Sequence, residues 1–355
     1  MIALITNKAE NFQDYNFVSN YDKNYKKEIN KCFNYNIENH PNFFLNQLHY
    51  QSKKIKVRID HYDNVKNKNK IELFIFLNVI KHSEIFSKKP KILLIMEYKS
   101  IKPILYKRNE HRFFDKIFTF ENNLIDNKKY FFFNGLQVIP KRAIFLMKKK
   151  RFEKCIFFAN KPNKNINSYF SKRLEIINYY KNQPKKLSLY GSNWDKLITP
   201  MNATIGSKIF YFIIKKIFHV FNFKIKKYNK IWKGVTKNLV LTTSKFKFCF
   251  IIENSPTLSG RIFLSFFSGT IPVYFGNISK IKLIPKTCYI NFKKYKKIDK
   301  LENFIDRMSK KKYLFYQKKI KNFLRSKKYQ KFSVENDTYK IFMEVKNLLF
   351  KHKKI

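Results

Sequence analysis

The feature that most limits the fold of this chain is a series of short, unbroken apolar runs, each followed at once by polar turn residues. Clear examples are "KILLIMEYKS" (91–100), "KCIFFANKP" (154–162), "KFKFCFIIENS" (245–255) and "TIPVYFGN" (270–277). Runs without polar alternation are typical of strands that are buried on both faces of a parallel sheet. Helical patterns lie between these runs, most clearly at residues 168–183. This alternation of strands and helices predicts an α/β fold.

The length of the chain, 355 residues, is large for a single domain, so we expect two packed domains. We place an N-terminal domain at residues 1–150 and a second domain at 151–308. A Lys-rich helical segment, 309–355, follows them. An apolar fraction of 44% is far above that of disordered chains and predicts a real core.

The formal net charge of +51 invites a nucleic-acid interpretation, but the distribution of the charge argues against it. Only nine of the 75 basic residues are Arg, and the Lys residues are spread along nearly the whole chain. Lys, Asn, Ile, Phe and Tyr are over-used together, as an AT-rich coding sequence would produce whatever the function. We therefore expect no nucleic-acid partner. A cationic surface still favours anionic partners, including nucleotide-sugars and anionic lipid.

The cysteines and the apolar segments indicate a cytoplasmic protein. The four cysteines form no CxxC pair and no metal-ligand spacing, and the first residues show no cleavage-site pattern. No apolar stretch reaches the roughly 18 to 20 residues of a membrane span. The segment 205–227 is apolar but broken by Lys pairs. It is either a basic amphipathic helix on a membrane surface or a core-facing helix with a solvated Lys stripe. Peripheral contact with the inner face of the cytoplasmic membrane therefore stays open.

Glycine is scarce, and its positions indicate where a ligand binds. Six of the seven glycines fall between residues 191 and 276, which favours the second half of the chain as the ligand domain. Within it, an apolar strand ends at Glu253 and Asn254, and a helix begins near Gly260 with Arg261 in its first turn. A cation is misplaced at a helix N-terminus unless an anion lies there too. We therefore expect either a bound diphosphate or an arginine that points into water.

Residues 246–277, "FKFCFIIENSPTLSGRIFLSFFSGTIPVYFGN", with "IPKTCYINF" after them, resemble the C-terminal signature of the α-1,3/4-fucosyltransferases, glycosyltransferase family 10. "IFFANKP" to "LSLYGSNW" is similar to the family's block of strand, helix with an arginine, and Tyr-Gly. The resemblance covers roughly residues 70–345 and is weaker before residue 90. It implies a GT-B fold of two Rossmann-like domains that face a cleft. The acceptor would be bound mainly by the N-terminal domain and GDP-fucose by the C-terminal domain.

The resemblance also implies roles for particular residues. Glu97 matches the catalytic base, with a solvated loop glutamate paired with Lys99 as the alternative. Arg173 matches the arginine of the donor diphosphate, although a plain arginine on the helix surface would fit as well. Asn254 matches the donor-contacting amide, and its alternative is a turn cap at the strand end. The implied donor site further includes Glu253, Arg261 and, in the donor loop, Ser255, Gly260 and Lys237.

The chain departs from the family pattern at "TLSGR", where the family has Thr-Glu-Lys. Arg261 can replace the lysine as a diphosphate cation. Gly260 cannot replace the glutamate, which binds a donor hydroxyl in the family. We expect an inverting α-1,3-fucosyltransferase that moves fucose from GDP-fucose to a surface glycan of the lipopolysaccharide O-antigen type, without a metal or other cofactor. The alternatives are a divergent or inactive member that binds nucleotide-sugar or glycan, a different donor sugar, and a basic nucleic-acid or membrane-surface binding protein. The sequence predicts neither the particular acceptor glycan and linkage nor the oligomeric state.

Overall fold

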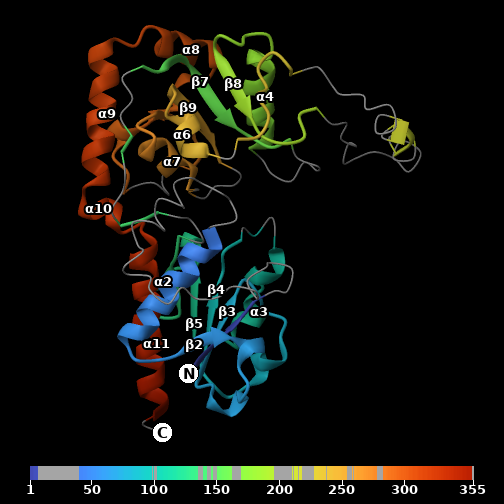
Figure 1. Cartoon of the computed structure of the whole chain (residues 1–355), viewed down its shortest axis with the longest axis vertical. Coiled ribbons are helices and arrows are strands. Elements are labelled where there is room, and N and C mark those ends of the chain that lie inside the picture. The colour runs from blue at the N-terminus through green and yellow to red at the C-terminus, as the bar shows by residue number, and fades with distance from the viewer. Residues whose placement is uncertain are drawn as a thin grey trace. The chain divides into compact units, whose positions relative to one another are not determined.

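The computed structural model describes residues 1–6, 40–97, 102–134, 139–141, 145–146, 150–161, 169–195, 228–236, 238–253, 260–277 and 283–353, with the short pieces 99, 210, 212–214, 216–217 and 258. The chain divides into two compact units. The first comprises residues 1–143 and 326–355, and the second comprises residues 144–325. Each unit contains a parallel sheet with helices packed against it (Figure 1).

The first unit is built on a six-stranded sheet in the order β2-β1-β3-β4-β5-β6, with every neighbouring pair parallel. Its strands are β1 (Ile2–Ile5), β2 (Ile59–His61), β3 (Leu73–Leu77), β4 (Lys91–Leu94), β5 (Lys116–Thr119) and β6 (Tyr130–Phe132). Its α-helices are α2 (His40–Lys54), α3 (Arg108–His111), α10 (Lys327–Gln330) and α11 (Val334–Lys353). Leu73–Leu77 is buried at all five positions, as a strand covered on both faces requires.

The second unit is built on a five-stranded parallel sheet in the order β11-β10-β9-β7-β8. Its strands are β7 (Phe152–Phe158), β8 (Leu187–Tyr190), β9 (Phe246–Ile252), β10 (Ile271–Phe275) and β11 (Ile290–Asn291). Its α-helices are α4 (Phe170–Tyr180), α6 (Leu239–Thr243), α7 (Arg261–Phe267), α8 (Ile298–Asp306) and α9 (Lys310–Leu324). The order reverses between β7 and β9. Parallel sheets bind ligands at such a reversal, at the carboxyl ends of the strands.

The Lys-rich segment 309–355, expected as one group of closing helices, is divided between the two units. Helix α9 belongs to the second unit, where Gln317 Nε2 donates a hydrogen bond to the Gly269 carbonyl over 2.8 Å. Helix α11 belongs to the first unit and packs against α2 (Figure 1). Asp337 of α11 accepts hydrogen bonds of 3.0 Å from the backbone and the side-chain amide of Asn134. Long-range polar contacts of this kind leave no signal in local periodicity.

Two further expectations concern the thiols and the helices. Cys155, Cys249 and Cys288 are free and buried, while Cys32 lies outside the described residues. Among the described helices, none is long and apolar enough to cross a membrane. Most of the amphipathic segment 205–227 also lies outside the described residues.

Candidate functional site

The candidate donor site lies at the carboxyl edge of the second sheet, where β7 and β9 are neighbours. The cause is topological. In a strand-helix-strand unit of a parallel sheet, each helix begins at the carboxyl edge, so residues early in a helix meet the ends of the strands. Helix α4 follows β7 in this way and begins near Tyr169. Helix α7 connects β9 to β10 and begins at Arg261.

Arg173, on the first turns of α4, reaches the end of β9. It is 6% exposed, and its Nε and Nη2 atoms donate hydrogen bonds of 3.2 and 2.6 Å to the Ile252 carbonyl. This side chain is therefore not a plain arginine on a helix surface. It is a buried cation at the reversal point of the strand order, and the carbonyl that it contacts belongs to the residue before Glu253. A buried guanidinium at this position can attract an anionic ligand while the carbonyl fixes its plane.

Glu253 extends β9 by one residue, because its backbone N–H donates to the Phe275 carbonyl over 3.0 Å. Its side chain is only 1% exposed and faces the hydroxyl of Tyr274. Burial, together with the charge of Glu253, raises the pKa of Tyr274. A Cβ at Gly276 would lie 2.7 Å from Glu253 Cγ and 2.4 Å from the Tyr274 hydroxyl oxygen. The glycine at 276 therefore leaves room for this buried pair of side chains.

Arg261 is the first residue of α7, and Gly260 is the residue that caps the helix, with helical backbone angles and no side-chain cap. The arginine is half-buried, and its Nη1 atom is buried without a hydrogen-bond partner among the described residues. The guanidinium lies close enough to Cys249 to lower the pKa of that thiol, although burial dominates and raises it to about 12. An arginine pointing freely into water does not fit these observations. A buried guanidinium nitrogen that lacks a partner among the described residues can be satisfied by an anionic ligand.

Three predicted donor residues, Asn254, Ser255 and Lys237, lie outside the described residues. Because α7 is only seven residues long, the electrostatic attraction for a phosphate rests on Arg261 more than on the helix dipole.

A cluster of aromatic rings and lysines, which the sequence did not reveal, lies next to Glu253 at the end of β10. Phe275 contacts the rings of Tyr169 and Phe292, with centroids 5.3 and 5.6 Å apart. The ammonium groups of Lys172 and Lys293 lie 5.7 and 5.1 Å from the centroid of Phe275. Each contact of this kind contributes roughly 0.5–1 kcal/mol at an exposed site.

The two lysines of this cluster differ in their ion pairing. Lys172 forms an ion pair with Glu175 over 2.8 Å, whereas Lys293 is exposed and has no ion pair among the described residues. The Lys293 ammonium is also 5.8 Å from the Tyr169 ring. A cation between two rings at the carboxyl edge can bind a phosphate while the rings contact a base or sugar. Lysine is so frequent in this chain that no sequence signal distinguished Lys293.

The predicted base, Glu97, lies in the first unit, three residues beyond the end of β4. It is half-buried. Its carbonyl accepts a hydrogen bond of 2.7 Å from the Tyr106 hydroxyl. The preceding residue, Met96, donates its N–H to the side chain of Asn78 over 3.2 Å. Asn78 directly follows β3 and has a left-handed φ of 58°. These hydrogen bonds fix the backbone at Met96 and Glu97.

The crowding of glycines in the second half, interpreted above as a sign of ligand approach, has packing causes at two positions. A Cβ at Gly191 (φ 145°) would lie 2.0 Å from the Ala159 carbonyl oxygen, and one at Gly269 (φ 63°) would lie 2.6 Å from the Leu146 carbonyl oxygen. Both glycines allow backbone segments to approach each other and adopt angles that other residues rarely take. At these two positions, glycine therefore indicates close backbone packing and does not identify a ligand contact.

A cavity lies in the first unit, near the C-terminal ends of α2 and α11, and is lined mainly by apolar side chains and lysines. Among the described residues, no group of three or more His, Cys, Asp or Glu side chains could hold a metal ion.

Comparison with known proteins identifies the fold. No family model matches the chain, and no curated protein sequence matches it. The match to the crystal structure of an α1,3-fucosyltransferase covers 98% of this chain and 89% of the fucosyltransferase chain, with a TM-score of 0.50 and 16% sequence identity. The HepE protein of Anabaena in complex with UDP covers 84% of this chain and 88% of its own, with a TM-score of 0.51 and 9% identity. The chain therefore has the GT-B fold, with two Rossmann-like α/β units.

Proposed function

We propose that this protein is a member of the α-1,3/4-fucosyltransferase family that transfers a sugar from a nucleotide-sugar donor to a glycan. The observation that carries the proposal is the buried Arg173, hydrogen-bonded to the Ile252 carbonyl at the reversal point of the second sheet. The GT-B fold supports it, as does the resemblance of residues 246–277 to the family signature. The solved structures of similar fold include one named as an α1,3-fucosyltransferase and one in complex with UDP.

The proposed donor is GDP-fucose, and the proposed acceptor is a surface glycan of the lipopolysaccharide O-antigen type. In the second unit, Arg173, Arg261 and Lys293 would bind the diphosphate. Asn254, with Ser255, Gly260 and Lys237 of the donor loop, would contact the nucleotide-sugar. The buried side chain of Glu253 is suited to hold the end of β9 against Tyr274, and thereby to position its neighbours, because it is almost fully excluded from solvent.

The proposed reaction is a single displacement with inversion. The acceptor hydroxyl oxygen forms a bond to the anomeric carbon of the sugar, and its proton passes to the Glu97 carboxylate. The bond between the anomeric carbon and the phosphate oxygen breaks, and its electron pair stays on the diphosphate. Arginine side chains stabilise the charge that develops on this leaving group, so the reaction needs neither a metal nor another cofactor.

The protein is proposed to work in the cytoplasm, in contact with an anionic membrane that presents the acceptor. A divergent member that binds nucleotide-sugar without turnover remains the second candidate. It is favoured by one observation, the replacement of the family's donor-binding glutamate by Gly260, which has no side chain.

Calorimetry and a turnover assay with GDP, UDP, GDP-fucose and duplex DNA test the proposal. We expect GDP to bind more tightly than UDP and GDP-fucose to be consumed in the presence of a glycan acceptor. GDP binding without turnover of any nucleotide-sugar would support the second candidate. Binding that is confined to DNA and strongly weakened by salt would contradict both.

A further inference from the structure

Helix α11 carries an apolar stripe on the side that faces away from its core contacts. Tyr339, Met343 and Phe350 are 55%, 41% and 59% exposed. Together with Lys346 they recur at intervals of four, three and four residues, so all four lie on one face of the helix. Surface helices normally place polar residues on this face. Three large apolar side chains in line are therefore a feature that a binding partner would explain.

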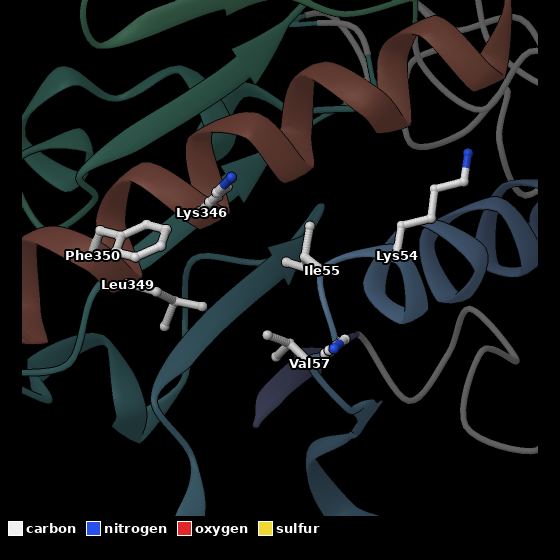
Figure 2. Close-up of a pocket in the computed structure, with 7 residues that line it drawn as sticks. Lys54, Ile55, Val57, Lys346, Leu349 and Phe350 are labelled. Carbon is white, nitrogen blue, oxygen red and sulfur yellow. The ribbon is translucent and has the colours of Figure 1, made fainter.

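A cavity of about 300 Å³ lies beside the C-terminal end of this stripe. Figure 2 shows Ile55 and Val57, which follow α2, on one side of it and Leu349 and Phe350 of α11 on the other. Its other lining residues are Lys54, Lys56 and Lys346, and none of the lining residues is acidic. The volume is at the lower end of the range for ligand pockets, about 300–1,000 Å³, and suits one chain end of an amphiphile.

The charged residues that line the cavity are all lysines. Lys53 and Lys54 end α2, and the Lys346 ammonium lies 5.7 Å from the centroid of the Phe350 ring. The nearest glutamate of α11 in the sequence, Glu344, forms an ion pair of 3.0 Å with Lys116, a residue of strand β5. Lysine stems can lie along an apolar surface while their ammonium groups reach phosphate groups at its border.

We propose that the stripe and the cavity dock on an anionic lipid bilayer. Tyr339, Met343 and Phe350 enter the boundary between headgroups and acyl chains, the lysines contact lipid phosphates, and the cavity accepts the end of one acyl chain. Aromatic and apolar residues interleaved with lysine favour this interface. A second copy of the same chain is disfavoured, because both copies carry a net charge of +51.

This inference assigns a surface to the membrane contact of the proposed function and rests on that function for its partner. It does not depend on donor chemistry. The stripe and the cavity belong to the first unit, whereas the donor residues belong to the second unit.

Co-sedimentation of the full chain with lipid vesicles tests the proposal. We expect binding to vesicles of equal parts phosphatidylcholine and phosphatidylglycerol, and much weaker binding to phosphatidylcholine alone. The double variant Lys346→Ala, Phe350→Ala should weaken binding to the anionic vesicles by about tenfold or more, because it removes one cation and one inserted ring. Met343→Glu should act in the same direction, because it introduces a charge into the middle of the stripe.

The matched control is the double variant Phe315→Ala, Lys319→Ala on α9 of the second unit. It removes the same two residue types. Phe315 is exposed, and the Lys319 ammonium lies 5.2 Å from the centroid of its ring. We expect a reduction of less than threefold, the part that general charge attraction explains. Equal losses in the two double variants, or unchanged binding in the α11 variants, would overturn the proposal.

Circular dichroism and GDP calorimetry on every variant complete the test. All of the substituted side chains are exposed, so we expect the fold to be retained. Normal vesicle binding in a parent protein that does not bind GDP would contradict the proposed function and leave the membrane surface intact. Normal GDP binding without vesicle binding would contradict the membrane surface alone.

Discussion

At the scale of single residues, the arginines of this chain have two different roles, one structural and one at the candidate donor site. Only nine of the 75 basic residues are arginine, and this scarcity is one reason to expect a bidentate phosphate contact at Arg173. Arg151 is also one of the few arginines, but its role is structural, because its two Nη atoms donate four hydrogen bonds to the protein. Rarity alone therefore does not separate the two uses. Arg261 differs because its buried Nη1 has no partner among the described residues.

Arg261→Ala is expected to weaken GDP binding about 10- to 150-fold, which corresponds to about 1.5–3 kcal/mol for a hydrogen bond to a charged group. Arg261→Lys should recover part of this loss, because the cation returns without the planar fork. Calorimetry measures both effects. The control, Arg307→Ala, removes an exposed arginine from the same unit and should have little effect. Parent-like GDP binding by Arg261→Ala would remove this residue from the phosphate site.

Glu97→Gln is expected to lower turnover by about two to four orders of magnitude, because the amide cannot accept the proton of the acceptor hydroxyl. GDP affinity should stay unchanged, since the proposed role concerns the acceptor. Turnover and calorimetry on the same preparation separate the two quantities. Glu110→Gln, in α3 of the same unit, should retain parent activity. A parallel loss of GDP affinity in Glu97→Gln would indicate a structural role instead.

Lys293→Ala tests the ring and lysine cluster at the end of β10. We expect GDP binding to weaken about threefold to thirtyfold, the effect of losing one exposed phosphate contact. Lys294→Ala is the matched control, since Lys294 belongs to the same short helix and is also exposed. Both variants change the net charge equally, so any difference reports the position of Lys293. Equal affinities of the two variants would place the cluster outside the donor site.

At the scale of elements, the two edges of the second sheet carry different tasks. At the amino ends of the strands, Arg151 connects Phe246 and Thr270, which lie at the starts of β9 and β10, with Leu146 and Ser268. Burial lowers the pKa of this arginine, although its ordinary value is so high that it stays charged. The carboxyl ends carry the candidate site. The hydrogen bonds of Arg151 thus connect the amino edge of the sheet, whereas the candidate ligand residues lie at the carboxyl edge.

Arg151→Lys is expected to lower the free energy of unfolding by about 2–4 kcal/mol, because a lysine cannot satisfy four acceptors that are fixed by the planar guanidinium. Urea denaturation followed by circular dichroism measures the change. Arg58→Lys is the control: Arg58 is 74% exposed, and its replacement should alter stability by less than about 0.5 kcal/mol. A difference within error between the two variants would show that the four hydrogen bonds contribute little.

At the scale of the whole molecule, the chain returns from the second unit to complete the first. The contact between Asn134 and Asp337 joins positions 203 residues apart and connects the loop after β6 to α11. Asp337 is buried, and its Oδ1 atom has no hydrogen-bond partner among the described residues. Burial raises the pKa of this carboxyl to about 7, while Lys340 and the Asn134 bonds oppose the shift. In the folded state, the carboxyl therefore stays protonated at pH values well above its ordinary pKa.

This carboxyl predicts a pH dependence of stability. Between about pH 4 and pH 7 the folded state binds a proton that the unfolded state has lost, so the free energy of unfolding falls as pH rises through this window, by on the order of 4 kcal/mol at most. Asp337→Asn cannot titrate and should flatten the profile. Urea denaturation at several pH values measures it. The exposed Asp299→Asn should keep the parent slope, and a parent slope in Asp337→Asn would contradict the assignment.

The sequence by itself determined the class of fold, because strands that are buried on both faces must be apolar throughout and must end at polar turns. The apolar runs at 245–255 and 270–277 predicted β9 and β10, and the resemblance predicted the GT-B fold that the solved structures share. It also placed Arg173 and Arg261 on the helices that begin at the carboxyl edge.

Only the tertiary structure decided which of these side chains face the interior and what they contact. Glu253 is buried against Tyr274, Lys293 lies near Tyr169 although 124 positions separate them, and α11 joins the first unit instead of the second. Local periodicity records which face of an element is apolar, but contacts between distant elements depend on strand order and packing. For that reason the α/β class followed from the pattern of residues, whereas the partners of the buried polar groups did not.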